Sequence, residues 1–250
     1  MKVNKAIIYI NVNKDNLMPA NRMQPLVAWR ALRRLIANPE QTQEVFAVIR
    51  ALSGPALENG LAKFRTTTVG QRVLLQKIDL LDTLLDREAL ATLPQSSLGR
   101  HYLSFVTREN IAADGLVEAS EEEGDFEYLQ GDLRRFGMRQ RDMHDLWHTL
   151  TDYGRDELGE ACLLAFTYGQ TRNRGLGVIC LAGCLKLSQF YGRGTFKAAW
   201  RAFRAGRKAA WLPGQDWEAL LSQPIAEIRR SLNISPPQDY LDLRASAFAT

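Results

Sequence analysis

The chain has 250 residues, of which 46% are hydrophobic and 24% are charged, and its formal net charge at pH 7 is +4. These values are typical of a globular protein and exclude a largely disordered chain. The excess of positive charge is too small to indicate nucleic-acid binding, and no nucleic-acid-binding motif accompanies it. We therefore expect no nucleic-acid partner.

Cysteine content and hydropathy set the compartment that we expect. The three cysteines, Cys162, Cys180 and Cys184, lie in apolar segments, which predicts packing residues rather than a disulfide framework. The apolar run at residues 6–12 is too short for a secretory signal, and no stretch reaches the roughly 18 apolar residues of a membrane span. We expect a cytoplasmic protein, with peripheral contact at the inner face of the cell membrane left open.

The elements predicted along the chain are helices. Residues 1–23 are expected to form an N-terminal arm of uncertain structure, because the β-branched run at 6–12 has no partner strand. From Pro25 onward apolar residues recur at helical spacing. The sequence thus predicts an all-α fold, a single-domain multi-helix bundle over residues 24–235, followed by a C-terminal tail at 236–250.

Two of the three histidines, His144 and His148, lie four residues apart. Because a helix turns about 100° per residue, His144, Asp145 and His148 fall on one arc of a helix. Leu146, on the opposite side, is left to pack against the core. Imidazole and carboxylate groups together suit a divalent metal ion. We predict one such ion per chain, with zinc as the first choice and iron or manganese as alternatives.

Glu160 is the fourth candidate ligand, but it reaches the histidines only if the chain turns back. On an unbroken helix it would lie about 18 Å beyond His148. We expect Gly154 to end the first helix in a left-handed conformation and Asp156 to cap a second helix. The prediction is therefore a metal site between two helices, with a break near residues 153–154.

Three further segments carry predictions. The acidic run at 121–125 is expected to be a solvated loop. Residues 176–187 are apolar and rich in small side chains, which predicts a central helix and a place where an isoprenoid tail could lie. Residues 195–211 predict a basic amphipathic helix, typical either of ordinary packing or of a membrane surface. Its cations include Lys197, Arg201, Arg204 and Lys208.

The motif His144-Asp145-x-x-His148, followed after eleven residues by Glu160, resembles the signature of a family of ubiquinone (coenzyme Q) biosynthesis proteins. The resemblance extends from about Pro25 to Ile234. It implies that His144, Asp145, His148 and Glu160 hold a metal ion, with Asp145 also a candidate catalytic base. Two other segments that are similar to the family are Leu93 to Tyr102 and a C-terminal region with Gly206-Arg207, Asp216-Trp217-Glu218 and Pro224.

The resemblance implies a metal-binding protein of ubiquinone biosynthesis that holds a polyprenylated aromatic precursor. A role in oxidative decarboxylation of the ring and in organising other enzymes of the pathway belongs to this expectation, as does a homo-oligomer. One alternative is a non-catalytic lipid-binding scaffold whose metal is structural. A further alternative is a metallohydrolase, because His-Asp-x-x-His resembles the His-Glu-x-x-His arrangement of zinc proteases.

Overall fold

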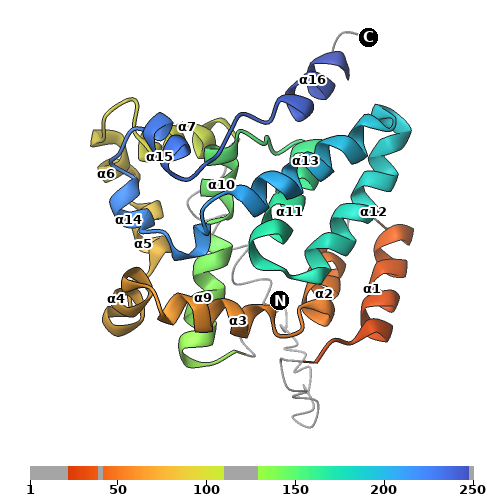
Figure 1. The fold of residues 1–250 in the computed structure, drawn as a ribbon, viewed down its shortest axis with the longest axis horizontal. Helices are drawn as coiled ribbons and strands as arrows, with labels where there is room; N and C mark the ends of the chain where they lie inside the picture. Colours follow the sequence, from red (N-terminus) through yellow and green to blue (C-terminus); the bar gives the residue numbers. More distant parts are fainter. Residues whose placement is uncertain (1–21, 39–41, 110–128, 248–250) are drawn as a thin grey trace, which may run out of the picture.

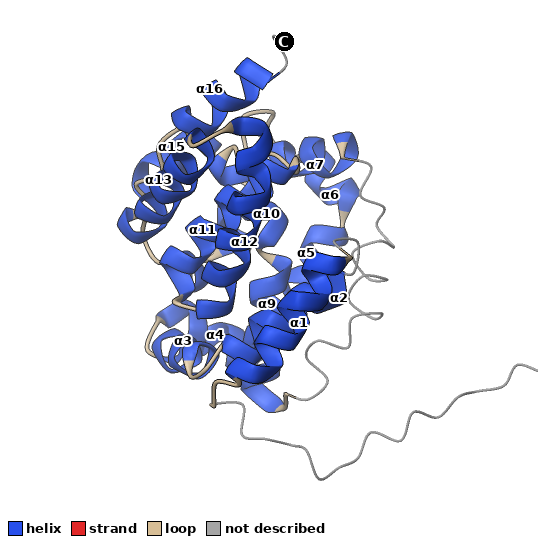
Figure 2. Cartoon of the chain, turned by 90° about the vertical axis from the view of Figure 1, so that its right-hand side faces the viewer, coloured by secondary structure: helices blue, strands red, loops and turns tan. Residues whose placement is uncertain are grey.

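The structure is a computed structural model that describes residues 22–38, 42–109 and 129–247. Within these ranges the regular elements are helices, and β-type pairing is limited to an isolated bridge between Ser97 and Pro224 (Figure 2). The all-α fold predicted from the sequence is therefore confirmed. The helices in chain order are α1 (Pro25–Ala37), α2 (Thr42–Leu52), α3 (Ala56–Arg65), α4 (Thr68–Gln76), α5 (Leu80–Leu85), α6 (Arg87–Thr92), α7 (Leu98–Arg108), α9 (Gly131–Asp142), α10 (His144–Thr151), α11 (Glu157–Thr171), α12 (Arg174–Tyr191), α13 (Gly194–Lys208), the 3-10 turn η2 (Leu212–Gly214), α14 (Trp217–Leu220), α15 (Ile225–Ser231) and α16 (Gln238–Ala247).

Helices α11 and α13 pack against each other near the middle of the molecule (Figure 1). Their close approach depends on Gly206 of α13, because a Cβ atom there would lie 2.2 Å from the carbonyl oxygen of Phe166 in α11. Gln170 joins the same two helices: its side-chain amide donates to the carbonyl of Gly206 at 2.5 Å and accepts from the N–H of Leu212 at 2.8 Å. The contact is therefore between backbones as well as side chains.

Helix α10, which carries both histidines, lies in the main hydrophobic core. Leu146 and Leu150 are fully buried, and Trp147 packs edge-on against Phe166 of α11 with ring centroids 6.1 Å apart. Burial of an apolar side chain of this size stabilises a fold by roughly 1.5–3 kcal/mol. Several such residues on one short helix fix the position of the polar residues on its other side.

Two segments that are distant in the sequence lie side by side, at residues 97–102 and 216–224. The N–H of Leu98 donates to the carbonyl of Gln223 at 2.9 Å. Nearby, the buried Arg139 of α9 makes two hydrogen bonds to the carboxylate of Glu218 in α14, at 2.6 and 2.8 Å. A bidentate pair of this kind fixes orientation as well as distance. The C-terminal region is thereby held against α7 and α9.

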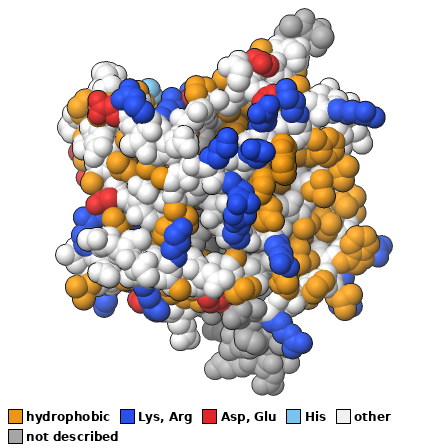
Figure 3. Space-filling view, viewed as in Figure 1, with side chains coloured by type: hydrophobic (Ala, Val, Ile, Leu, Met, Phe, Trp, Pro, Cys, Tyr) orange, Lys and Arg blue, Asp and Glu red, His pale blue; other side chains and the backbone are white. Residues whose placement is uncertain are grey.

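Helix α12 differs from its prediction. The expectation of a central helix at 176–187 is wrong, because only one side of α12 is buried. Leu181, Leu185 and Phe190 on the other side are more than half exposed. Trp29 of α1 is also exposed. Figure 3 shows an apolar area at the right, on the side of the molecule where Figure 1 draws α1 and α12. A helix with few charges gave no periodic signal to reveal this outer face.

Several predicted segments lie outside the described residues. These include most of the N-terminal arm, with the run at 6–12, and the acidic run at 121–125. Within the predicted C-terminal tail, residues 238–247 form α16. Its Tyr240 is buried, and its Asp239 forms ion pairs with Lys197 and Arg201 of α13, at 2.7 and 3.7 Å. These two cations therefore already face a carboxylate.

A pair of glycine substitutions tests the packing of α11 on α13. Gly206→Ala is expected to lower the free energy of unfolding by about 3 kcal/mol, because the neighbouring backbone cannot move aside as a side chain could. Gly183→Ala in α12 is the control, since a Cβ there would meet only the Cβ of Ala161 at 3.9 Å. The control is expected to be neutral or to stabilise by up to ~1 kcal/mol. Equal melting temperatures for the two variants in thermal denaturation would contradict this packing.

Candidate metal centre

The first three predicted ligands project from the beginning of α10. His144, Asp145 and His148 offer ligand atoms that all lie within 4.8 Å of one another. The predicted arc is therefore present. Asp145 and His148 are buried, whereas the side chain of His144 is 44% exposed. The cluster thus lies at the edge of the core and opens to solvent beside His144.

The chain breaks between α10 and α11, as the sequence predicts, but a different residue ends α10. Asp152, rather than Gly154, adopts the left-handed conformation, with φ 61°, and its N–H donates to the carbonyl of His148 at 3.0 Å. The prediction for Gly154 is wrong because aspartate also tolerates this conformation. The carboxylate of Asp152 is held by Arg229 of α15 at 2.6 Å.

Gly154 serves close packing instead. A Cβ atom on Gly154 would lie 2.6 Å from the hydroxyl of Tyr240, and one on Gly159 would lie 2.0 Å from the carbonyl oxygen of Gly154. The first turn of α11 therefore rests directly on the backbone of the connecting loop. This contact lets α11 begin only a few residues after α10 ends.

Asp156 caps α11, as predicted from the sequence. Its carboxylate accepts a hydrogen bond from the N–H of Gly159 at 3.0 Å. The hydroxyl of Tyr240 donates to the other carboxylate oxygen of Asp156 at 2.6 Å and accepts from the N–H of Gly154 at 2.9 Å. Burial raises the pKa of Tyr240, so this hydroxyl keeps its proton. One tyrosine from α16 therefore holds the middle of the loop at Gly154 and its last residue, Asp156.

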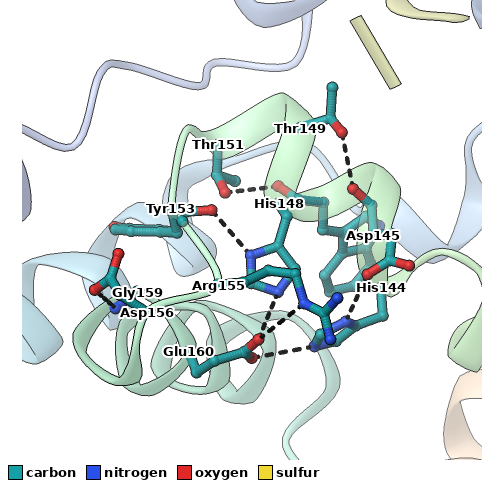
Figure 4. Close-up of polar contacts among 12 residues, drawn as sticks. His144, Asp145, His148, Thr149, Thr151, Tyr153, Arg155, Asp156, Gly159 and Glu160 are labelled. Atoms are coloured by element: carbon teal, nitrogen blue, oxygen red, sulfur yellow. Dashed lines mark hydrogen bonds and ion pairs between the residues drawn. The ribbon is translucent and has the colours of Figure 1, made fainter. Parts of the chain in front are cut away.

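The turn brings Glu160 back to the histidines (Figure 4). Oε1 of Glu160 lies 3.3 Å from Nε2 of His148, and Oε2 lies 3.8 Å from Nε2 of His144. Nε of Arg155 is 3.9 Å from the same carboxylate. All four predicted site residues are thus gathered in one cluster. Glu160 and Asp145 lie beside different nitrogens of the His144 ring.

The ring of His148 is fixed in a single orientation. Its Nδ1 lies 2.9 Å from the carbonyl oxygen of Tyr153, and a carbonyl can only accept, so Nδ1 carries the hydrogen. The ring is also stacked on Phe105 of α7, with centroids 5.6 Å apart. Nε2 is buried and has no hydrogen-bond partner of suitable geometry within the described part of the chain. Its lone pair faces Glu160, an arrangement that a proton or a cation between them would stabilise.

His144 shows the same pattern. Its Nδ1 lies 3.5 Å from Oδ1 of Asp145, and its Nε2 is directed toward Glu160. The two imidazole rings meet edge to face, with centroids 4.7 Å apart. Each ring therefore has an acceptor beside Nδ1, and both rings present Nε2 to the carboxylate of Glu160. Carboxylate or carbonyl acceptors at the second ring nitrogen are characteristic of histidines that ligate metal ions.

Burial and pairing set the charges of the cluster. Burial lowers the pKa of His144, but the hydrogen bond with Asp145 and the charge of Glu160 outweigh it and raise the pKa above its ordinary value. Burial raises the pKa of both Asp145 and Glu160, yet their interactions with the histidines hold both pKa values below the usual range. Both carboxylates are therefore ionised at neutral pH. Two carboxylates and two imidazoles form a donor set that fits zinc, iron or manganese.

Several residues that shape the site were not predicted. Arg155 and the carbonyl of Tyr153 lie inside the motif, but no spacing rule identifies them. Phe105 and Tyr240 come from α7 and α16, and the sequence near the motif carries no signal for them. Only the tertiary structure brings these residues to the histidines.

The fold and the site together define a helical protein with a candidate metal centre of two histidines and two carboxylates. Residues 15–238 match the sequence profile of the family described as Coenzyme Q (ubiquinone) biosynthesis protein Coq4. Because this match covers most of the 250 residues, the chain belongs to that family. The family resemblance noted from the motif is therefore confirmed.

Individual relatives agree with this assignment. The chain is 29% identical over 215 residues to the mitochondrial ubiquinone biosynthesis protein COQ4 of Clavispora lusitaniae, covering 85% of this chain and 65% of that protein. It is 28% identical over 209 residues to the mitochondrial COQ4 homolog of Anopheles gambiae, covering 80% of this chain and 69% of that protein. The chain thus spans about two thirds of the length of these curated relatives.

A solved structure supports the fold. A crystal structure from Nostoc punctiforme, of a protein provisionally named for ubiquinone biosynthesis, superposes with a TM-score of 0.60 and 19% sequence identity. The similarity covers 84% of this chain and 98% of that one.

None of the helices in the described ranges has the length and apolar character that crossing a membrane requires. The cytoplasmic location expected from the sequence stays a prediction, and the two relatives above are named as mitochondrial proteins.

The hydroxyl of Tyr240 offers a test of the loop. Tyr240→Phe is expected to lower the free energy of unfolding by about 1–3 kcal/mol, because both Gly154 and Asp156 lose a buried partner. Tyr191→Phe in α12 is the matched control, since its hydroxyl makes no hydrogen bond among the described contacts. Thermal denaturation of both variants gives the comparison. A Tyr240→Phe variant as stable as the control would show that the loop is held by other contacts.

Proposed function

We propose that this chain is a metal-binding protein of ubiquinone biosynthesis that holds a polyprenylated aromatic precursor beside His144, His148 and Glu160. The observation that carries the proposal is the convergence of two histidine Nε2 atoms on one carboxylate, at 3.3 and 3.8 Å. Membership of the family supports a role in ubiquinone biosynthesis. The cluster of histidines and carboxylates supports metal binding.

In this proposal His144, His148 and Glu160 hold one divalent ion, with zinc as the first choice and iron or manganese as alternatives. The buried Nε2 of His148, which faces Glu160 without a hydrogen bond of suitable geometry among the described residues, fits such an ion. When bound, a divalent cation would supply Lewis-acid chemistry to an oxygen of the aromatic ligand. Because the side chains of His144 and Glu160 are 44% and 33% exposed, a ligand has access to the site from solvent.

Asp145 takes a positioning role in this arrangement. It lies at Nδ1 of His144, and its lowered pKa makes it a weak base and a stable negative charge. We therefore assign Asp145 to holding the proton and the orientation of His144. This assignment replaces the fourth-ligand and catalytic-base roles that the sequence left open. It follows the rule that an acceptor behind a ligating histidine fixes the tautomer.

The exposed side of α12 is the proposed place for the prenyl tail. Helix α12 lies along the first half of α11: Sγ of Cys180 donates to the carbonyl of Ala161, and Nζ of Lys186 lies 3.1 Å from Glu157. Both partners are close neighbours of Glu160 in the sequence. The exposed Leu181 and Leu185 would offer apolar contact to a tail or to the surface of a membrane.

The alternatives differ in what the metal does. A structural metal in a lipid-binding scaffold would favour a closed site of four protein ligands. The exposure of His144 and the position of Asp145 behind its ring favour an open site of three ligands. A metallohydrolase remains the third candidate, with the motif as its support. Decarboxylation of the ring, the organisation of other enzymes, membrane contact and a homo-oligomer belong to the proposal and await measurement.

The variant Asp145→Asn tests the proposed function. In a strain whose ubiquinone depends on this chain, we expect ubiquinone to fall at least tenfold at normal protein abundance. The physical reason is that loss of the charge behind a ligating histidine typically costs about 10–100-fold in metal affinity or activity. A prenylated precursor that keeps its ring carboxylate is expected to accumulate. Ubiquinone and its precursors are measured by mass spectrometry beside protein abundance.

Asp152→Asn is the matched control, because it makes the same chemical change at the end of α10. Asparagine keeps the left-handed conformation there. Control cells should retain normal ubiquinone. Normal ubiquinone in the Asp145→Asn strain would contradict the proposal. A fall that merely follows lower protein abundance would favour the structural-metal alternative.

A further inference from the structure

A second site lies at the other end of α11. A cavity of about 790 Å³ opens between the end of α11, α3, α9 and the segment from the end of α13 to η2. It is lined by Tyr168, Gly169, Gln170 and Thr171, whereas none of the four candidate metal ligands lines it. From Glu160 to Gln170, α11 rises about 15 Å. The cavity and the candidate metal centre are therefore separate sites on one helix.

The mouth of this cavity is cationic. Lys63, Arg172, Arg174 and Arg207 line it, and no aspartate or glutamate of the described ranges does. Among the described residues none of these four side chains forms an ion pair with a carboxylate. Figure 3 shows several Lys and Arg side chains near the middle of the face that it draws. Unpaired cations around a concavity concentrate anions from solution.

Aromatic rings line the cavity beside the cations. Nζ of Lys63 lies 4.2 Å from the centroid of the Trp211 ring, and Tyr168 is stacked on Phe203 of α13. Phe136 of α9 adds a third ring to the lining. Gly60, Gly169 and Gly206 also belong to the lining. The cavity thus combines flat apolar surface with donors for an anion.

The backbone holds one of the cations in an unusual way. Arg172 follows the last turn of α11 with φ 62°, a position more commonly filled by glycine or asparagine. The next residue, Asn173, caps α12 by accepting from the N–H of Gly175 at 2.9 Å. The positive end of the α12 dipole therefore adjoins the arginines. This field adds to the attraction for a multiply charged anion.

From this cavity we infer a binding site for a phosphate monoester carried on an aromatic or apolar group. Three arginines and a lysine match a phosphate dianion better than a single carboxylate, because arginine presents paired donors to phosphate oxygens. The volume lies in the range of small-molecule sites, about 300–1,000 Å³. A soluble phosphate ester and the phosphate of a lipid headgroup share this chemistry. The inference does not rest on the metal centre.

The experiment is a titration of the full chain with phenyl phosphate, with the Kd measured by isothermal titration calorimetry. The pocket variant is the double substitution Arg172→Gly and Arg207→Gln, in which glycine keeps the left-handed turn. The control is Arg30→Gln with Arg33→Gln, which removes the same charge from exposed positions of α1. We expect the Kd for phenyl phosphate to rise at least tenfold in the pocket variant and less than twofold in the control.

Additional probes identify the source of the phosphate. Inorganic phosphate should bind at least tenfold more weakly than phenyl phosphate, because it lacks the ring contacts. Co-sedimentation with phosphatidic acid vesicles that phenyl phosphate displaces would identify a lipid headgroup. Phenyl phosphate binding without vesicle binding would identify a soluble ester.

Three results would overturn the inference: no binding of phenyl phosphate to the wild type, equal weakening in the control, or equal affinity for inorganic phosphate. The melting temperature and metal content of the pocket variant are measured in parallel. Both should match the wild type, which separates loss of this site from damage to the fold or to the metal centre.

Discussion

The site depends on the contact between the first turn of α11 and the backbone of Gly154. A Cβ atom on Gly159 would approach the carbonyl oxygen of Gly154 to 2.0 Å, so that only glycine lets the two segments touch. The contact reverses the chain within the few residues between Thr151 and Glu157. Without the reversal, Glu160 would lie about 18 Å from His148 along a continuous helix. With it, the two side chains lie 3.3 Å apart.

The surroundings of the histidines set their orientation before any ligand arrives. His148 is held by the carbonyl of Tyr153 and by the ring of Phe105, and His144 by Asp145. Both Nε2 atoms consequently face Glu160. The core residues of α10 keep this geometry rigid, while the exposed edge at His144 leaves access for a ligand. Helix α11 also ends at the cationic cavity, so one helix connects the two proposed sites.

Much of the fold and part of the site could be predicted from the sequence. Helical periodicity placed His144, Asp145 and His148 on one arc, and turn chemistry placed the break that returns Glu160. The left-handed residue was predicted at Gly154 rather than Asp152, because both residue types tolerate that conformation. The exposed side of α12 could not be predicted, since an apolar helix without charges does not show which side is covered. The contact of Tyr240 with the loop arises from a segment 84 positions beyond Asp156 and has no local signal.

The most direct test of the central claim is X-ray absorption spectroscopy of the zinc-loaded protein, combined with elemental analysis. The geometry predicts close to one zinc per chain, bound by two imidazole nitrogens at about 2.0 Å and carboxylate oxygen at about 2.0–2.2 Å. His144→Ala should remove one imidazole from the zinc shell, and Glu160→Ala should remove the carboxylate, each with loss of bound metal. Unchanged metal content in both variants, or a wild-type shell with fewer than two imidazoles, would contradict the account.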